Sequence, residues 1–256
     1  MKQLLFVILI ALFSIAVGAE TIEKTFSIDG HPTLNLSNIS GDIHVMQGNE
    51  GEIIVKAENP NPKVEVVFKQ AGNKITVETK YPRHTKNIKE GVRFEVWIPM
   101  YSDVKLNTVS GDIVLGSVEG RLYLNSVSGN IDMSEVAGNL KLNTVSGDIS
   151  LNGLGDSDLD ANAVSGDIIL SNASLASGNY EFNSTSGDIE IWHSAEASYN
   201  ISGQSLSGDM VQKTGDQVSI SKAKYTGMKS LSGTYNTGDA EIDCNTISGD
   251  IRIGVK

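Results

Sequence analysis

A short phrase that recurs at nearly constant intervals is the feature that most limits how this chain can fold. Residues 106–113 recur with full identity at residues 142–149, and looser copies end in Ser-Gly-Asp or Ser-Gly-Asn. Between residues 111 and 208 the glycines of successive copies are 18 to 21 residues apart. Periods near 20 residues are typical of stacked repeat architectures. The glycines of the phrase are Gly41, Gly111, Gly129, Gly147, Gly166, Gly187, Gly208 and Gly249.

Each 18-residue period divides into two units of nine residues, because further glycines fall midway between the copies, at Gly120 and Gly138. Counting glycine as position one, apolar residues return at positions three, five and eight. Positions three and five alternate with polar neighbours, which indicates a short strand with one buried face. Position eight, occupied for example by Val127 and Val145, predicts a third inward side chain before the next turn. No window has the three- and four-residue spacing of a helix.

The residue types of the phrase suit a sharp corner. Glycine can adopt positive φ and has no Cβ to collide with the next coil, and Ser and Asp can bond their own turn backbone. One asparagine also recurs at a fixed phase. Stacked strands lie about 4.8 Å apart, so amides in register can bond one another as a ladder. The sequence predicts such a ladder along Asn107, Asn125, Asn143, Asn162, Asn183 and Asn245.

The chain therefore reads as an all-β protein, a β-solenoid (single-stranded β-helix) of about 18–21 residues per coil. Residues 1–19 resemble a secretory signal peptide: Lys2, an apolar run, and Val17-Gly18-Ala19 as a cleavage site. Residues 20–103 are expected to form irregular coils that cap the amino-terminal end, because a bare terminal coil exposes unpaired edge and apolar core. Residues 104–256 are expected to form the regular solenoid, with an expanded coil at about 209–247.

Charge and cysteine content narrow the function classes. The formal net charge is −11 and becomes −12 when Lys2 leaves with the signal peptide. This acidity argues against nucleic acid and against electrostatic adhesion to anionic lipid. No stretch after the signal peptide is apolar and long enough to span a membrane, so we expect a periplasmic or secreted protein. Cys244 is the one cysteine, and its position in the repeat predicts that it is buried and acts as a small hydrophobic side chain.

A family resemblance follows from the phrase Val96-Trp97-Ile98-Pro99, the strand at 104–113 and the iterated Ser-Gly-Asp-Ile behind a signal peptide. In these features the chain resembles the bacterial "putative adhesin" family of β-strand-repeat proteins, also described as a domain of unknown function. The resemblance covers nearly the whole mature chain. It implies an extracytoplasmic β-solenoid and brings no catalytic residues with it.

Two other functions are compatible with some of the acidic residues: cleavage of a polysaccharide and binding of calcium. A carbohydrate-active enzyme of the right-handed β-helix type needs paired carboxylates. Outward carboxylates on neighbouring coils (Asp160, Glu181 and Glu190, with Asp132 and Asp158 close in sequence) could supply them, but they also fit an ordinary solvated face.

Calcium is the second alternative, because Asp167, Asp188 and Asp209 form a column of like charge at the repeat phase. Solvation in water is the simpler interpretation, and we predict no catalytic residue, metal or cofactor.

Aromatic residues give the candidate ligand contacts. By alternation, Trp97 and Trp192 should point away from the core, and His193 follows Trp192 directly. Exposed aromatics on a flat sheet suit sugar rings or a protein partner. We therefore expect a non-catalytic, envelope-associated scaffold or binding module, whose partner is an envelope polysaccharide or a surface protein. Oligomeric state is left open.

Overall fold

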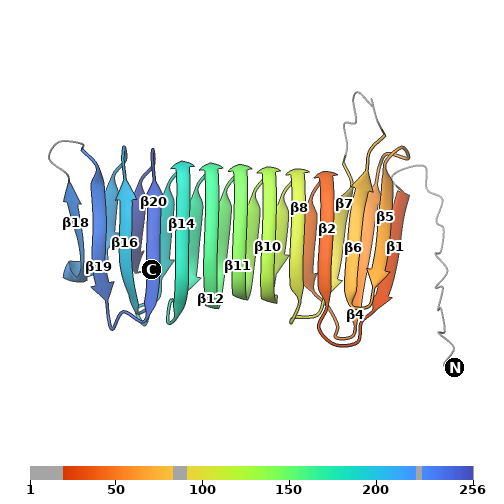
Figure 1. The fold of residues 1–256 in the computed structure, drawn as a ribbon, viewed down its shortest axis with the longest axis horizontal. Coiled ribbons are helices and arrows are strands. Elements are labelled where there is room, and N and C mark those ends of the chain that lie inside the picture. The colour runs from red at the N-terminus through yellow and green to blue at the C-terminus, as the bar shows by residue number, and fades with distance from the viewer. Residues whose placement is uncertain (1–19, 83–90, 223–226, 256) are drawn as a thin grey trace.

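The computed structural model describes residues 20–82, 91–222 and 227–255, and this part of the chain is all-β. The one helical turn described is a short 3-10 turn, η1 (Gly215–Gln217). The strands stack into an elongated block whose two ends are formed by different parts of the chain (Figure 1). In chain order they are β1 (Glu20–Ser27), β2 (Thr33–Ser40), β3 (Ile43–Gln47), β4 (Glu52–Asn59), β5 (Glu65–Ala71), β6 (Lys74–Lys80), β7 (Arg93–Ile98), β8 (Asp103–Ser110), β9 (Ile113–Gly116), β10 (Glu119–Ser128), β11 (Ile131–Ser146), β12 (Ile149–Ser165), β13 (Ile168–Ala173), β14 (Gly178–Ser186), β15 (Ile189–His193), β16 (Tyr199–Ser205), β17 (Met210–Lys213), β18 (Val218–Lys222), β19 (Lys229–Tyr235), β20 (Ala240–Thr246) and β21 (Ile251–Val255).

Strand pairing forms two layers, and β11 and β12 are long enough to contribute to both. The first layer runs β5, β6, β2, β8, β10, β11, β12, β14, β20, β16, β19, β18. The second layer runs β1, β4, β7, β3, β9, β11, β12, β13, β15, β21, β17.

The register of the central strands follows the sequence repeat. Leu122 pairs in parallel with Leu140, 18 residues later, and Ile149 pairs with Ile131 on one side and Ile168 on the other. The isoleucines of this row are fully buried, as are the other apolar residues at positions three and five. The core between the two layers is aliphatic along these central strands, as the alternation predicts, and elsewhere it also contains the buried rings of Phe94, Tyr180 and Phe182.

Position eight behaves differently in the two half-units. Val136 is buried as predicted, but Val127 and Val145 are 45% and 49% exposed, so the predicted inward position is wrong for them. Before Val136 the chain turns through Glu135 at φ +53°, which moves the next side chain to the inside. No such turn precedes Val127. Strand alternation continues from Leu124, so Ser126 takes the inward place and Val127 points out.

The corner glycines are required mainly by close approach of neighbouring coils. A Cβ built on Gly129 would lie 2.1 Å from the carbonyl oxygen of Gly111, and one on Gly147 would lie 2.3 Å from that of Gly129. Gly147 has φ +151° and Gly111 has φ +139°, whereas Gly129 does not adopt positive φ. Positive φ therefore explains only some of these glycines, and the missing Cβ explains all three.

Two strand pairs lie in the stack out of sequence order. The β2–β3 pair lies between β6–β7 and β8–β9, so residues 20–103 and 104–256 share one set of ladders. The β20–β21 pair lies between β14–β15 and β16–β17. Asp250 consequently separates Asp188 from Asp209, which corrects the adjacency inferred from their spacing.

One sequence prediction, the signal peptide at 1–19, falls outside the described residues. Within the described residues, no helix is long or apolar enough to cross a membrane.

Candidate functional site

Trp192 lies on the outer surface of the second layer, as its phase predicts. It is partly buried, because its six-membered ring covers Gly254 on the neighbouring strand β21. A Cβ on Gly254 would lie 3.0 Å from Cζ3 of the indole. The indole Nε1–H donates to Oε2 of Glu190 at 3.1 Å, and the Lys213 ammonium lies 5.7 Å from the ring centroid. The indole is thus held next to Gly254 of β21, with the Lys213 ammonium over its ring.

Trp97 occupies the same outward row of the second layer, on β7. It is partly buried and pairs with Ile54 on β4 and Met46 on β3. Six strand-to-strand steps separate it from Trp192, which places the two backbones about 29 Å apart. The two tryptophans therefore share a face but do not form one compact site. The positions between them in this row include Gly116, Ser134, Asn152 and Ser171.

His193 does not join Trp192 on the surface. Its side chain is 1% exposed, because the residue after an outward tryptophan points inward. The Tyr199 hydroxyl donates to its Nε2 at 2.8 Å, and its Nδ1–H donates to the carbonyl oxygen of Ser194 at 2.7 Å. Burial lowers the pKa of His193, and the bond to Ser194 only partly offsets this. In this structure His193 belongs to the core of the carboxy-terminal end and cannot touch a ligand on the outer face.

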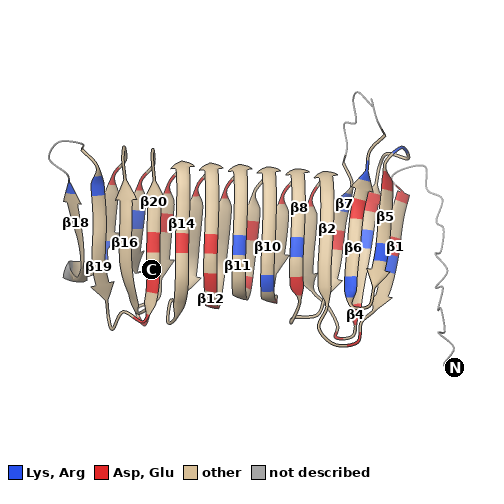
Figure 2. Cartoon of the chain, viewed as in Figure 1, with Lys and Arg blue, Asp and Glu red and all other residues tan. Residues whose placement is uncertain are grey.

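The carboxylates considered for glycoside chemistry are divided between the two outer faces. Asp160 and Glu181 are neighbours on the first layer, where Lys141 forms an ion pair with Asp160. Glu190 and Asp132 lie on the second layer, on the other side of the core. Figure 2 shows acidic residues gathering on β12, β14 and β20 of the first layer. The structure does not bring Glu190 together with the first-layer carboxylates.

The predicted asparagine ladder is confirmed. The Asn125 amide donates to Oδ1 of Asn107, and the Asn143 amide donates to Oδ1 of Asn125, both at 2.9 Å. The same bond continues to Asn162, Asn183 and Asn245, at 3.2, 3.1 and 3.4 Å. These side chains lie on the outer surface of the first layer and are half-buried, except that of Asn245, which is exposed.

The aspartate column is neither merely solvated nor arranged around a cation. At each coil the carboxylate or amide Oδ1 accepts the backbone N–H of the next column residue, as from Asp167 to Asp148 at 2.8 Å and from Asp188 to Asp167 at 2.7 Å. Arg252 adds ion pairs to Asp188, Asp250 and Glu190. Among the described residues, no group of three or more His, Cys, Asp or Glu is placed to hold a metal ion. The column caps backbone amides between coils.

An exposed apolar row runs along one corner of the stack and includes Val127 and Val145, which the sequence phase had assigned to the core. We call it the apolar ridge. It crosses eight coils, with a threonine at one of them, and spans about 34 Å at the strand spacing. Its apolar side chains are 43–53% exposed. In spatial order the ridge consists of Ile39, Val109, Val127, Val145, Val164, Thr185, Ile247 and Leu206.

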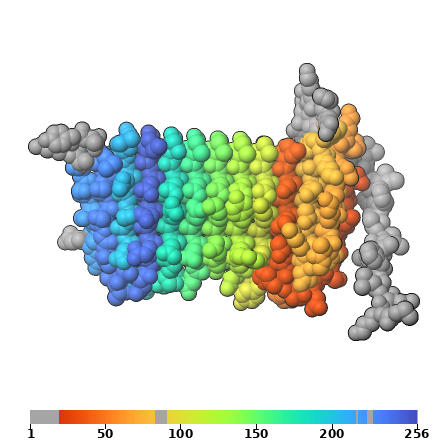
Figure 3. All heavy atoms as spheres, viewed as in Figure 1, coloured from red at the N-terminus to blue at the C-terminus, as the bar shows by residue number. Residues whose placement is uncertain are grey.

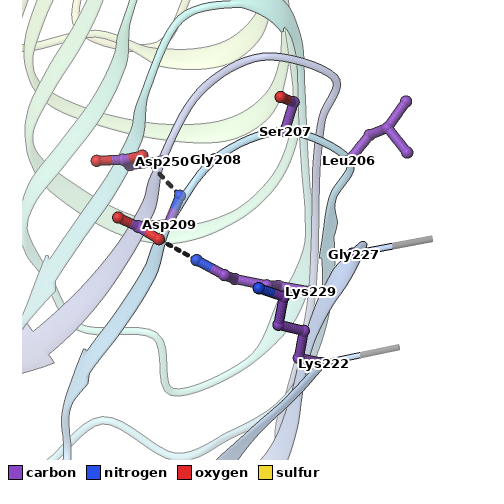
Figure 4. Close-up of a pocket in the computed structure, with 8 residues that line it drawn as sticks. All are labelled: Leu206, Ser207, Gly208, Asp209, Lys222, Gly227, Lys229 and Asp250. Carbon is purple, nitrogen blue, oxygen red and sulfur yellow. Dashed lines mark hydrogen bonds and ion pairs between the residues drawn. The ribbon is translucent and has the colours of Figure 1, made fainter. Parts of the chain in front are cut away.

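An open depression adjoins the carboxy-terminal end of this ridge (Figure 4). It has a volume of about 430 Å³ and lies between the corner at Leu206 and strands β18 and β19. Lys229 forms an ion pair with Asp209, and Lys222 points into the same space. Its lining is mostly polar and has no enclosed apolar floor, which is unlike a typical small-molecule pocket.

Cys244 is buried, as predicted, and burial raises the pKa of its thiol. A thiol with a raised pKa carries little thiolate and is a poor nucleophile. Its role is that of a small apolar core residue.

The fold and these surfaces define an all-β repeat protein with long, regular outer faces. The chain belongs to the Toastrack DUF4097 family, whose model matches residues 99–254. This match confirms the resemblance recognised in the repeated phrase. No curated protein matches the chain.

Solved structures of low sequence identity are also similar. A "putative cell adhesion protein" from Clostridium sporogenes is 11% identical, with 93% of this chain and 100% of that chain covered and a TM-score of 0.41. A "putative adhesin" from Bacteroides fragilis is 13% identical, with 91% and 97% covered and a TM-score of 0.41. A "putative lipid binding protein" from Parabacteroides distasonis is 13% identical, with 91% and 96% covered and a TM-score of 0.33. We draw no functional argument from likenesses at this level.

Proposed function

We propose that this protein is an extracytoplasmic β-solenoid, periplasmic or secreted, that acts without catalysis as a scaffold or binding module of the cell envelope. The observation that carries the proposal is the apolar ridge. The solenoid itself is supported by the in-register parallel pairing of successive coils, 18 residues apart in the regular part. The face drawn in Figure 3 consists of parallel ribs, one for each coil.

The ridge has the character of a protein contact surface. Scattered exposed apolar residues are normal, but a contiguous exposed apolar row marks an interaction site. Valine is a good choice for such a row because its β-branched side chain loses little rotamer freedom on binding. The regular spacing of the coils presents these side chains as a straight line rather than as an irregular patch.

Charge indicates what kind of protein would bind. The aspartate column follows the same corner three residues beyond the ridge, and Asp112, Asp148 and Asp167 make no ion pair among the described residues. A complementary surface would carry an apolar row bordered by Lys or Arg. We therefore propose an envelope protein with a basic, apolar face as the partner. The negative charges of the aspartate column would repel an acidic partner or an anionic lipid surface.

The alternative, a carbohydrate-active enzyme of the β-helix type, is less well supported. Such an enzyme needs two carboxylates flanking one bond. Asp160 and Glu181 are adjacent on one face, but Lys141 pairs with Asp160, and Glu190 lies on the opposite face. Hydrolysis of a polysaccharide panel that Glu181→Gln abolishes would favour this alternative.

The binding role can be tested by replacing three ridge valines together, as Val127→Ser, Val145→Ser and Val164→Ser. Immobilised wild-type protein should retain one or more envelope proteins in a salt-sensitive manner, and the triple variant should lose at least 90% of that retention. Val114→Ser is the matched control, because Val114 is also an exposed valine but lies on the second layer. Equal retention by wild type and the triple variant would show that the ridge is not the contact surface.

The proposed location has its own test. After expression in a bacterial host, we expect the protein in the periplasm or the medium, with its amino terminus at Glu20. A full-length protein that starts at Met1 in the cytoplasm would contradict it.

A further inference from the structure

We propose that the outward row from Trp97 to Trp192 on the second layer binds a straight, neutral glycan chain that runs along the axis of the stack. This inference rests on the proposed binding role, but it uses a different face from the apolar ridge. It names the ligand class that the second layer would take.

The first observation is that Trp192 is built as a platform. Glycine at position 254 leaves room for the indole to lie over the neighbouring strand, and any Cβ there would meet the ring at 3.0 Å. The bond from Nε1–H to Glu190 fixes the ring in its plane, and Arg252 holds the Glu190 carboxylate at 2.9 Å. A flat aromatic ring that is held rigid stacks on the C–H face of a pyranose at little entropic cost.

The second observation is the row that leads away from this platform. Met46, which is 37% exposed, lies in the row beside Trp97. The remaining outward positions between the tryptophans are the small residues Ser134, Asn152 and Ser171 and the bare Gly116, so most of the row is low. They also offer hydroxyl and amide groups, and Asn172 holds the Asn152 amide in place through a bond of 2.6 Å.

The third observation excludes other polymers. A peptide bound by strand addition needs an unpaired sheet edge, whereas this row lies in the middle of a sheet with paired strands on both sides. Nucleic acid needs a basic surface, and the net charge is −11. Around Trp192, Arg252 pairs with Asp188, Glu190 and Asp250, and the Lys213 ammonium lies over the ring, so two positive charges face three negative ones. A neutral chain of hydroxylated rings fits what remains.

The geometry also predicts a dependence on chain length. A short oligosaccharide can stack on one tryptophan only, whereas a chain that reaches across about 29 Å can stack on both. The second contact is then intramolecular and adds affinity without any new kind of interaction. A straight glycan should therefore bind more tightly than its own disaccharide.

The sequence supplies a specific probe, because Trp97 and Trp192 are the only tryptophans. In Trp97→Phe, all tryptophan emission comes from Trp192, and in Trp192→Phe it comes from Trp97. The probes are cellohexaose, xylohexaose and N-acetylchitohexaose, each with its disaccharide, titrated against each variant. We expect at least one hexasaccharide to shift the emission of both variants to shorter wavelength. Its disaccharide should bind at least tenfold more weakly.

Further variants separate this inference from a general aromatic effect and from the ridge. Trp192→Ala should weaken hexasaccharide binding at least tenfold, as measured by calorimetry, without changing the midpoint of thermal unfolding by more than a few degrees. Gly254→Ala keeps the indole but displaces it and should also weaken binding. The triple ridge variant should bind the glycan like wild type. Failure of all three hexasaccharides to bind, or equal binding by wild type and Trp192→Ala, would overturn the inference while leaving the ridge test unaffected.

Discussion

The backbone N–H of Asp250 donates to Oδ1 of Asp188 at 2.8 Å, although 62 residues separate the two in sequence. This bond shows that the end of the chain returns to lie inside the stack. It also brings Arg252 against the Asp188 carboxylate. Arg252 therefore sets the local charge beside Asp188, although the sequence repeat gives no sign that these two residues are neighbours.

Replacement of Asp188 should consequently destabilise the protein. Burial raises the pKa of Asp188, but the bond from Asp250 and the pairing with Arg252 outweigh it and leave the pKa below its ordinary value. Asp188→Asn removes the ion pair with Arg252 and should lower the free energy of unfolding by about 1 kcal/mol, measured in urea at pH 7. Repulsion within the column alone would instead predict an unchanged or raised stability.

The control for this variant is Asp167→Asn, which keeps the side-chain acceptor for the next coil. A neutral Asn130 already fills this role for Asp148 in the same column. We expect Asp167→Asn to be nearly neutral, within about 0.5 kcal/mol. Because the depressed pKa of Asp188 favours folding above the unfolded value near 3.9, the difference between wild type and Asp188→Asn should fade as the pH falls below 4.

The asparagine ladder should contribute to stability through its interior members. Asn143→Ala removes the acceptor of the Asn162 amide and the donor to Asn125. The expected loss is about 1 kcal/mol, since the ladder is half-buried and water can partly replace the lost bonds. Asn139→Ala, on the same strand but fully exposed, should cost less than about 0.5 kcal/mol. Equal stabilities of the two variants would mean that the ladder is energetically silent.

The corner glycines should be intolerant of any side chain. Gly129→Ala places a methyl group 2.1 Å from the carbonyl oxygen of Gly111, so neighbouring coils must separate. We expect a loss of more than about 2 kcal/mol in the free energy of unfolding, or insoluble protein. Gly72→Ala is the comparison, because that turn has open space around it but a φ of +61°. Its cost should be about 1 kcal/mol, the usual strain of a left-handed residue.

These contrasts show which parts of the fold the sequence could predict. The alternation of apolar residues located the inward row that contains Ile149, because a strand has one side-chain period and one buried face. It misplaced Val127 because the same apolar residue type occupies position eight in both half-units. Only the backbone turn at Glu135 distinguishes Val136 from Val127, and glutamate carries no strong signal for positive φ.

The candidate surfaces were predictable to different degrees. Alternation correctly placed Trp97 and Trp192 outward, and it could equally have placed His193 inward. The apolar ridge was hidden because exposed and buried valines look alike in sequence. Arg252 beside Asp188 was not predictable, since insertion of β20–β21 between β15 and β17 depends on how the carboxy-terminal end closes rather than on the repeat.

The buried histidine should make stability depend on pH. Because burial depresses the pKa of His193, the folded state holds the neutral ring more strongly than the unfolded chain does. The resulting stability is fully present above the unfolded pKa of about 6.5, and it decreases as the pH falls from 6.5 toward the lower folded value. The free energy of unfolding in urea should therefore fall between pH 7.5 and pH 5.5, with a slope of at most about 1.4 kcal/mol per pH unit for a single proton. His193→Phe keeps an aromatic ring against Tyr199 and Tyr235 but cannot titrate, so its free energy of unfolding should change much less over this range. If His193→Phe and wild type show the same loss between the two pH values, the titrating group lies elsewhere in the chain.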